Sequence, residues 1–390
     1  MATSGTDGEQ QMNSAAFGRR SHRSERGVDR IGGEPESLVG AQCGGVVGLD
    51  VEHDLGFPGG ASSADCGGKN TLSAEGSTAQ QNAIAVFNQV WGQKCAGKNL
   101  SYNPTGSGAG VNQFIAGQVD FAGSDSPLSK DQPAQAAKRC GDNPAWNLPL
   151  VFGPVALAYN LPGVDKVAVS ADVLAKIFSG GITAWNDPAI AALNAGVTLP
   201  DTKITPIYRS DSSGTTDNFQ KYLTAAAPQS WTKGAGKEFQ GGAGEGAQKS
   251  AGVVQAVQAT PGAIGYVEKG FATQANLPMA AIDTGSGAVA LTDGTAATAI
   301  AGAKFAAEGN DLALDLNSIY GTTAPGAYPL VLATYEVVCS KGYNAETAGA
   351  VKSFLTVAAN DGQAGLSSAG YIALPDSFKQ RLLTAVNAIQ

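Results

Sequence analysis

The pattern of apolar and polar positions becomes regular at Lys69 and predicts short strands that alternate with amphipathic helices. After a strand over residues 70–74, apolar side chains recur at helical spacing as Ile84, Phe87 and Trp91. The order of strand, small polar loop and helix then returns, with strands over residues 100–102 and 119–122 and a helix carrying Val111, Phe114 and Ile115. This alternation is typical of a parallel sheet, whose loops gather at the carboxyl ends of the strands.

Two longer apolar runs, residues 149–160 and 328–338, are alike in character. We expect each to form a strand that crosses between two lobes, the second returning the chain to the first lobe. The other expected elements are helices over residues 170–178, 187–194, 250–259, 345–358 and 375–389, and strands over residues 204–208 and 262–267. The pattern therefore predicts an α/β fold.

Residues 207–219 predict the end of a strand, a tight polar loop and the start of a helix. The first turn of a helix has unpaired N–H groups and a partial positive charge, so it can bind an anion. Gly214 would let the backbone approach a ligand closely, and Arg209 would add a bidentate positive charge. The simpler alternative is a capped helix beside a surface arginine. Arginine is rare beyond residue 60, where only Arg139, Arg209 and Arg381 occur, and this favours a binding role for Arg209.

Three loops share this character. Ser77 with Thr78, then Ser107, and finally Ser213 with Thr215 each lie between a predicted strand and a predicted helix. If the loops converge, an anion would meet several backbone N–H groups and hydroxyls at once. Each charge-assisted hydrogen bond contributes roughly 1.5–3 kcal/mol, so a few would give micromolar binding.

Two aspartates adjoin these loops. Asp125 ends a predicted strand, where a carboxylate would repel an anion unless the ligand donates a proton to it. A ligand with a P–OH group can do so, whereas sulfate at neutral pH cannot, and a mismatched site rejects a ligand by ~10⁴–10⁵. Asp211 lies two residues from Arg209 and is expected to orient its guanidinium. The alternative for both is a helix cap or turn aspartate.

Composition excludes several classes of protein. The chain has 390 residues, a formal net charge of −8 and a pI of about 4.9, which disfavour nucleic-acid binding. The sequence contains no apolar run of ~18 residues, so no membrane span is predicted. The histidines, His22 and His53, both precede the regular region, so a histidine-dependent nucleophile or a mixed His/Cys metal site is not expected in the body. The cysteines fit either buried thiols or disulfides with one left over; they are Cys43, Cys66, Cys95, Cys140 and Cys339.

Residues 1–60 differ from the rest of the chain. They are rich in Gly, Ser and charge, contain five arginines and show little apolar periodicity, so we expect a disordered leader of uncertain origin. No apolar segment follows the arginines as a secretory signal requires.

Three motifs together resemble the extracytoplasmic phosphate-binding protein of the phosphate-specific ABC transporter, most closely its actinobacterial members. They are RSDSSGTTD at residues 209–217, GSGAG at residues 106–110 and DFAGSDSPL at residues 120–128. The resemblance covers about Cys66 to Gln390. It implies a two-lobe periplasmic-binding-protein-like fold of type II, in which each lobe is a sheet flanked by helices and two crossing strands act as a hinge. The implied lobes are residues 61–150 with 335–390, and residues 151–334.

The resemblance also implies the binding residues. Asp125 would accept the phosphate proton and Asp211 would hold Arg209. The direct contacts would come from Thr78, the Ala79 amide, Ser107, Arg209, Ser213, Gly214 and Thr215. Many relatives have an aromatic residue at the position of Ala79, but only the amide would be used.

By the same resemblance we expect disulfides Cys66–Cys95 and Cys140–Cys339, and a location outside the cytoplasm in the cell envelope, with membrane anchoring as a lipoprotein in the native protein. The implied function is capture of inorganic phosphate and its delivery to the permease subunits of the transporter, without catalysis, metal or cofactor. Alternatives are a phosphatase or phosphoryl-transfer enzyme using Asp125, a receptor for sulfate, molybdate or another oxyanion, and a surface adhesin or scaffold.

Overall fold

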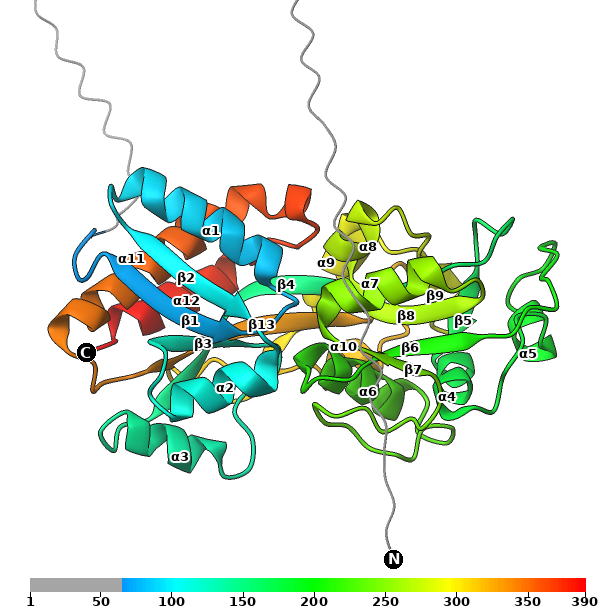
Figure 1. Cartoon of the computed structure of the whole chain (residues 1–390), viewed down its shortest axis with the longest axis horizontal. Coiled ribbons are helices and arrows are strands. Elements are labelled where there is room, and N and C mark those ends of the chain that lie inside the picture. The colour runs from blue at the N-terminus through cyan, green and yellow to red at the C-terminus, as the bar shows by residue number, and fades with distance from the viewer. Residues whose placement is uncertain (1–64) are drawn as a thin grey trace, which may run out of the picture. The chain divides into compact units, whose positions relative to one another are not determined.

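The computed structural model describes residues 65–390 (Figure 1). The leader expected over residues 1–60 lies outside the described residues, as does Cys43. Within the described part, every helix is too short or too polar to cross a membrane.

The first lobe is built on three parallel strands, and α1 and α11 cover one face while α2 and α3 cover the other (Figure 1). The predicted apolar face of α1 is buried, and the Trp91 ring meets Phe354 of α11 edge-on at a centroid distance of 5.4 Å. The strands are β1 (Thr71–Gly76), β2 (Asn99–Pro104) and β3 (Phe121–Ser124). The helices are α1 (Gln81–Lys94), α2 (Ser107–Ile115), α3 (Gln132–Arg139), α11 (Ala345–Asn360) and α12 (Asp376–Asn387).

The second lobe repeats this plan, with β6 between β8 and β7 and all three strands parallel. Its strands are β6 (Thr205–Arg209), β7 (Glu245–Ala247) and β8 (Ala263–Glu268). Its helices include α4 (Ala171–Ser179), α5 (Pro188–Ala191), α6 (Gly214–Ala226), α7 (Lys249–Ala259) and α8 (Lys269–Gln274).

Two long strands join the lobes, as the apolar runs predicted. Residues 145–154 of β4 (Ala145–Tyr159) pair antiparallel with β13 (Val331–Cys339), and residues 155–159 of β4 pair antiparallel with β8. In the described part, one sheet of eight strands therefore runs through both lobes in the order β2-β1-β3-β13-β4-β8-β6-β7. The predicted lobe boundaries fall inside β4 and β13 and stay a prediction.

The segment after α8 forms short elements that periodicity did not predict. They include β9 (Ala281–Asp283), β10 (Ala288–Val289), α9 (Asp293–Ile300), β11 (Lys304–Phe305), β12 (Leu314–Asp315) and α10 (Asn317–Tyr320). The strands β9 and β10 form a small sheet with β5 (Ala168–Ser170), which comes from earlier in the chain and was not predicted either. Strands of two or three residues are too short to show an alternating pattern.

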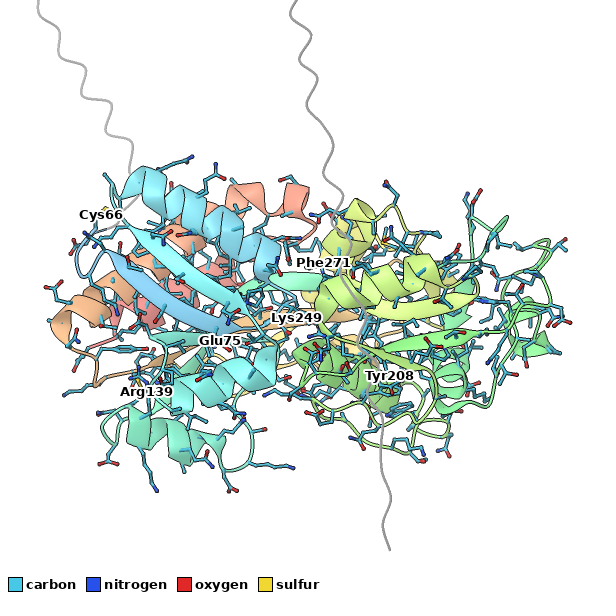
Figure 2. The ribbon with its side chains drawn as sticks, in the orientation of Figure 1. Cys66, Glu75, Arg139, Tyr208, Lys249 and Phe271 are labelled. Atoms are coloured by element: carbon cyan, nitrogen blue, oxygen red, sulfur yellow. A yellow bond between two sulfur atoms is a disulfide. The ribbon has the colours of Figure 1, made fainter. Side chains whose placement is uncertain are left out.

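Both expected disulfides are present among residues 65–390. Cys66–Cys95 joins the start of the described chain, labelled in Figure 2, to the end of α1. Cys140–Cys339 joins the end of α3 to the end of β13. The pairing of the cysteines is therefore confirmed, and the alternative of buried thiols is wrong for these four.

Candidate functional site

Asp125, just beyond the end of β3, is the centre of a buried hydrogen-bond network. Among the described residues, three hydroxyls from three segments donate to its carboxylate. Ser77 Oγ lies 2.5 Å from Oδ1, Thr334 Oγ1 lies 2.7 Å from Oδ1, and Ser107 Oγ lies 3.0 Å from Oδ2. The loops after β1 and β2 and the crossing strand β13 therefore meet at one carboxylate.

The start of α6 packs against the same carboxylate. A Cβ atom on Gly214 would lie 2.6 Å from Asp125 Cβ and 2.7 Å from Ser107 Oγ, which real contacts do not permit. Asn218 Nδ2 donates to the backbone oxygens of both Asp125 (2.7 Å) and Gly214 (2.8 Å). The second lobe thus contacts the first at the loops that the sequence singled out.

The glycine-rich loop of α2 fits against the loop before α6. The N–H of Gly108 donates to the backbone oxygen of Ser212 at 3.0 Å, and a Cβ atom on Gly108 would lie 2.1 Å from Ser212 Oγ. Only glycine permits this approach. Ser213 caps α6 by accepting the N–H of Thr216 at 3.2 Å, and this leaves its own O–H free to act as a donor.

Arg209, the last residue of β6, is buried and held by Asp211. Its Nε donates to Asp211 Oδ1 at 2.7 Å, and its Nη2 donates to Oδ2. Burial lowers the pKa of Arg209, but the hydrogen bonds and charge of Asp211 outweigh burial and hold it above its ordinary value. Burial also raises the pKa of Asp211, and Arg209 outweighs it, so that pKa lies below its ordinary value. Both groups are therefore charged at neutral pH.

The start of α7 joins the site as a further helix N-terminus that the sequence did not associate with it. Thr78 Oγ1 and Ser250 Oγ are hydrogen-bonded at 2.8 Å across the two lobes. The N–H of Lys249, labelled in Figure 2, donates to Asp211 Oδ1 at 2.9 Å. The N–H of Ala79 donates to Ser77 Oγ at 3.0 Å.

Thr215, in the first turn of α6, donates its hydroxyl to Glu268 Oε1 at 2.6 Å. Glu268 ends β8 and is only 1% exposed, and its Oε2 has no hydrogen-bond partner within residues 65–390. The charge of the Glu268 carboxylate raises the pKa of both Asp125 and Arg209.

The electrostatics of Asp125 follow from its surroundings. Burial and the charge of Glu268 together raise its pKa to about 6, against the opposing effect of the hydroxyls of Ser77, Thr334 and Ser107. Asp125 is therefore ionised at neutral pH and acts as an acceptor.

The loops, Arg209 and both aspartates were named from the sequence, but several partners were missed. These are Asn218, Ser250, Glu268, Thr334 and Glu336. A sequence signal existed for Glu336, which is a charged residue inside an apolar strand. Thr334 and Ser250 carry no such signal, because their roles depend on contacts between distant segments.

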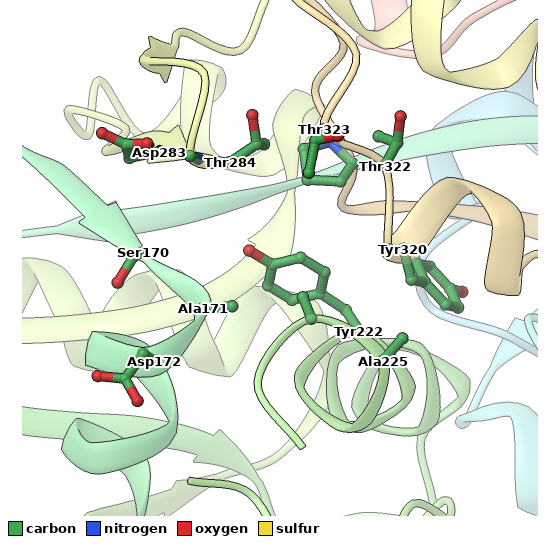
Figure 3. A pocket seen from close by; sticks show the side chains of 14 residues that line it. Ser170, Ala171, Asp172, Tyr222, Ala225, Asp283, Thr284, Tyr320, Thr322 and Thr323 are labelled. Carbon is green, nitrogen blue, oxygen red and sulfur yellow. Dashed lines mark hydrogen bonds between the residues drawn. The ribbon is translucent and has the colours of Figure 1, made fainter. Parts of the chain in front are cut away.

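The cavities of the protein differ in chemistry. One of about 130 Å³ reaches Asp125 between Asn218 of α6 and Tyr335 of β13. Another of about 310 Å³, shown in Figure 3, is lined by hydroxyls and by the carboxylates of Asp172 and Asp283, and no basic side chain lines it. The second cavity therefore does not suit an anion.

Residues 65–390 contain no group of three or more His, Cys, Asp or Glu side chains placed to hold a metal. The polar groups at the lobe junction include helix N-termini, hydroxyls, the amide of Asn218, the buried Arg209 and the carboxylates of Asp125, Asp211 and Glu268.

Two α/β lobes, joined by crossing strands and meeting at polar helix N-termini, define the class of two-lobe periplasmic-type binding proteins. The model of the PBP superfamily domain matches residues 61–361. The chain is 54% identical over 331 residues to phosphate-binding protein PstS 3 of Mycobacterium tuberculosis, covering 84% of this chain and 89% of the relative. It is 50% identical over 357 residues to phosphate-binding protein PstS2 of Mycobacterium bovis, covering 90% and 95%. The chain therefore belongs to the PstS family of phosphate-binding proteins.

Solved structures share the fold. A high-affinity periplasmic phosphate-binding protein (PfluDING) bound with phosphate superposes with a TM-score of 0.65 at 23% identity, covering 81% of this chain and 93% of that chain. A putative phosphate ABC transporter substrate-binding protein from Clostridium perfringens, with bound phosphate, gives 0.56 at 16% identity, covering 78% and 100%. At these identities the likeness is one of fold.

Proposed function

We propose that this protein captures inorganic phosphate between its two lobes and delivers it to the permease subunits of an ABC transporter in the cell envelope. The observation that carries the proposal is Asp125, an ionised, buried carboxylate that accepts hydroxyls from the loops before α1 and α2 and packs against the start of α6. A site for a fully deprotonated anion would gain nothing from such an acceptor. Membership of the PstS family supports the same ligand.

The proposed contacts use the groups at the lobe junction. Arg209 supplies the positive charge, and Asp211 fixes its orientation. Asp125 accepts the proton of the phosphate. The donors are Thr78, the Ala79 amide, Ser107, Ser213, Gly214 and Thr215. The hydroxyls of Ser107 and Thr215 and the N–H of Ala79 donate within the protein in this structure, so binding requires these groups to change partner. Binding of ligand to both lobes favours the closed arrangement, and the permease releases phosphate when it opens the lobes.

We also propose that the protein is not an enzyme, needs no metal or cofactor, and works outside the cytoplasm, anchored to the membrane as a lipoprotein. The relatives are phosphate-binding proteins, and the buried carboxylate of Asp125 is hydrogen-bonded to three hydroxyls, which lowers its nucleophilicity while leaving it able to accept one more hydrogen bond.

Isothermal titration calorimetry of the full chain tests the proposal. Phosphate should bind at one site per chain, and sulfate or molybdate in excess should not displace it. Tighter binding of sulfate or molybdate would assign the protein to another oxyanion. Turnover of a phosphate ester would make it an enzyme, and no oxyanion binding at all would leave an adhesin or scaffold.

A further inference from the structure

Glu336 is a buried carboxyl group in the middle of the crossing strand β13. Its side chain lies on the same face of the strand as Thr334, two residues earlier, which donates to Asp125. Glu336 is 0% exposed. Its Oε2 accepts one hydrogen bond from Gln80 Nε2 at 3.3 Å, and its Oε1 has no partner within residues 65–390.

A chain of hydrogen bonds connects Glu336 to Asp125. Gln80 Nε2 also donates to Tyr102 Oη at 3.2 Å, and Tyr102 O–H donates to the backbone oxygen of Ser77 at 2.7 Å. Ser77 in turn donates its hydroxyl to Asp125 at 2.5 Å. Glu336 therefore supports the loop of Thr78 and Ala79 through Gln80 and Tyr102.

The fit beneath this loop is tight. A Cβ atom on Gly123 of β3 would lie 2.1 Å from Gln80 Nε2 and 2.6 Å from Tyr102 Oη. Because the side chains of Gln80 and Tyr102 fill this space, we expect a change in the charge of Glu336 to displace them and the loop above them.

No cation among the described residues neutralises Glu336. The titratable groups that face it are Tyr102 from β2 and Asp125 from the end of β3, and Gln80 is neutral. Its neighbours across the sheet are Leu148 of β4 and Gly123 of β3. A buried carboxylate without a counter-ion is costly, so the neutral carboxyl is favoured. Burial, together with the charge of Asp125, raises the pKa of Glu336 to about 8.

We propose that Glu336 is a positioning residue of the phosphate site: its neutral carboxyl holds Gln80 and Tyr102 beneath the first phosphate loop, and its ionisation weakens phosphate binding. This inference rests on the proposed function. The ionised form adds a negative charge next to Asp125 and to the bound anion. A bound anion disfavours the ionised form of Glu336 further. The phosphate affinity is therefore highest below about pH 8, where Glu336 is neutral, and falls as the pH rises through and above that value.

Calorimetric phosphate titrations between pH 6.5 and 9.5 test the proposal on the full chain, the variant Glu336→Gln and the control Glu346→Gln. Glu346 is an exposed carboxylate in the first turn of α11, so its substitution removes the same charge outside the network. We expect Glu336→Gln to bind phosphate at pH 7 as tightly as the wild type does. Between pH 7 and 9, the phosphate affinity of the wild type should fall by about tenfold more than that of the variant, since one unit of pKa shift corresponds to tenfold. The control should follow the wild type.

Identical pH profiles for the wild type and Glu336→Gln would overturn the inference. Absence of phosphate binding by the wild type at every pH would instead overturn the proposed function. If Glu336→Gln does not fold, the titration of the wild type is followed instead by ¹³C NMR of its labelled glutamate carboxyl groups. A glutamate carboxyl that titrates above pH 7, with a midpoint that phosphate raises, supports the inference; no glutamate titrating in that range refutes it.

Discussion

In the proposed site, Asp125 is the residue that determines selectivity, because its buried carboxylate accepts three hydroxyls and would also accept the proton of the ligand. Asp125→Asn keeps the shape but replaces an acceptor by an amide that also donates. We expect the discrimination between phosphate and sulfate to fall by at least ~10-fold, since mismatched buried polar groups are what reject the wrong ligand. Competition calorimetry measures this ratio.

The pH dependence gives a second reading of the same residue. In the wild type the discrimination should fall as the pH drops through about 6, where Asp125 takes up a proton, and the Asn variant should show no such change. Equal selectivity of variant and wild type at neutral pH would remove Asp125 from the role of proton acceptor.

Arg209 supplies the full positive charge at the lobe junction. Arg209→Ala removes the guanidinium and leaves Asp211 without its counter-ion. We expect phosphate binding to weaken by at least ~10-fold, because charge-assisted bonds contribute about 1.5–3 kcal/mol each. Arg381→Ala is the matched control, since Arg381 lies over the Phe305 ring at the surface. Unchanged affinity in Arg209→Ala would place the anion elsewhere.

At the scale of elements, the position of α6 depends on the absence of a side chain at Gly214. Gly214→Ala would bring Cβ to within 2.6 Å of Asp125 Cβ, so the start of α6 must move away from the first lobe. We expect phosphate affinity to fall by roughly 10-fold or more, since an ångström of displacement lengthens several hydrogen bonds together.

Gly252→Ala on α7 is the control for this prediction. Its Cβ would meet Ala247 only at an ordinary 3.8 Å, and alanine favours a helix. This variant should bind phosphate as the wild type does. Similar affinities for the two alanine variants would show that the contact between α6 and Asp125 is not needed.

Alternating apolar runs and polar loops were enough to predict most of the longer strands and helices, including the crossing strands β4 and β13, but not α3 or β7. The crossing strands are long, and their apolar faces are fully buried, so the pattern is strong. The short strands between β8 and β13 were not predicted, because strands of two or three residues show no alternating pattern, and β9 also depends on β5 from a distant part of the chain.

The candidate site was predictable in its loops and not in its supports. Ser107, Asp125 and Arg209 lie where strand ends and helix starts are visible in the sequence. Ser250 and Thr334 meet Thr78 and Asp125 only because the two lobes and the crossing strand bring them together. Such contacts leave no local pattern.

At the scale of the whole molecule, the disulfides cross-link loops of very different length. Cys66–Cys95 spans 29 residues and Cys140–Cys339 spans 199. On the chain-entropy model, replacing Cys140 and Cys339 by alanine should reduce the free energy of unfolding by roughly 1–2 kcal/mol more than replacing Cys66 and Cys95. Denaturant unfolding of both double variants measures the difference.

The four cysteines are not among the proposed phosphate-binding residues, so both double variants should keep wild-type affinity for phosphate while folded. Equal losses of stability would argue against the entropic origin, and a loss of affinity would show that a disulfide supports the site.

The Cys140–Cys339 bond also bears on how the protein can open. It fastens the ladder of β4 and β13 at the end where Ala145 pairs with Cys339, while at the other end β4 leaves its partner after Pro154 and continues along β8. We therefore expect rotation of one lobe against the other to be confined to the region around residues 154–155 and 330–331. In such a rotation Asp125 would move with the cross-linked body, and α6 would approach it or withdraw from it.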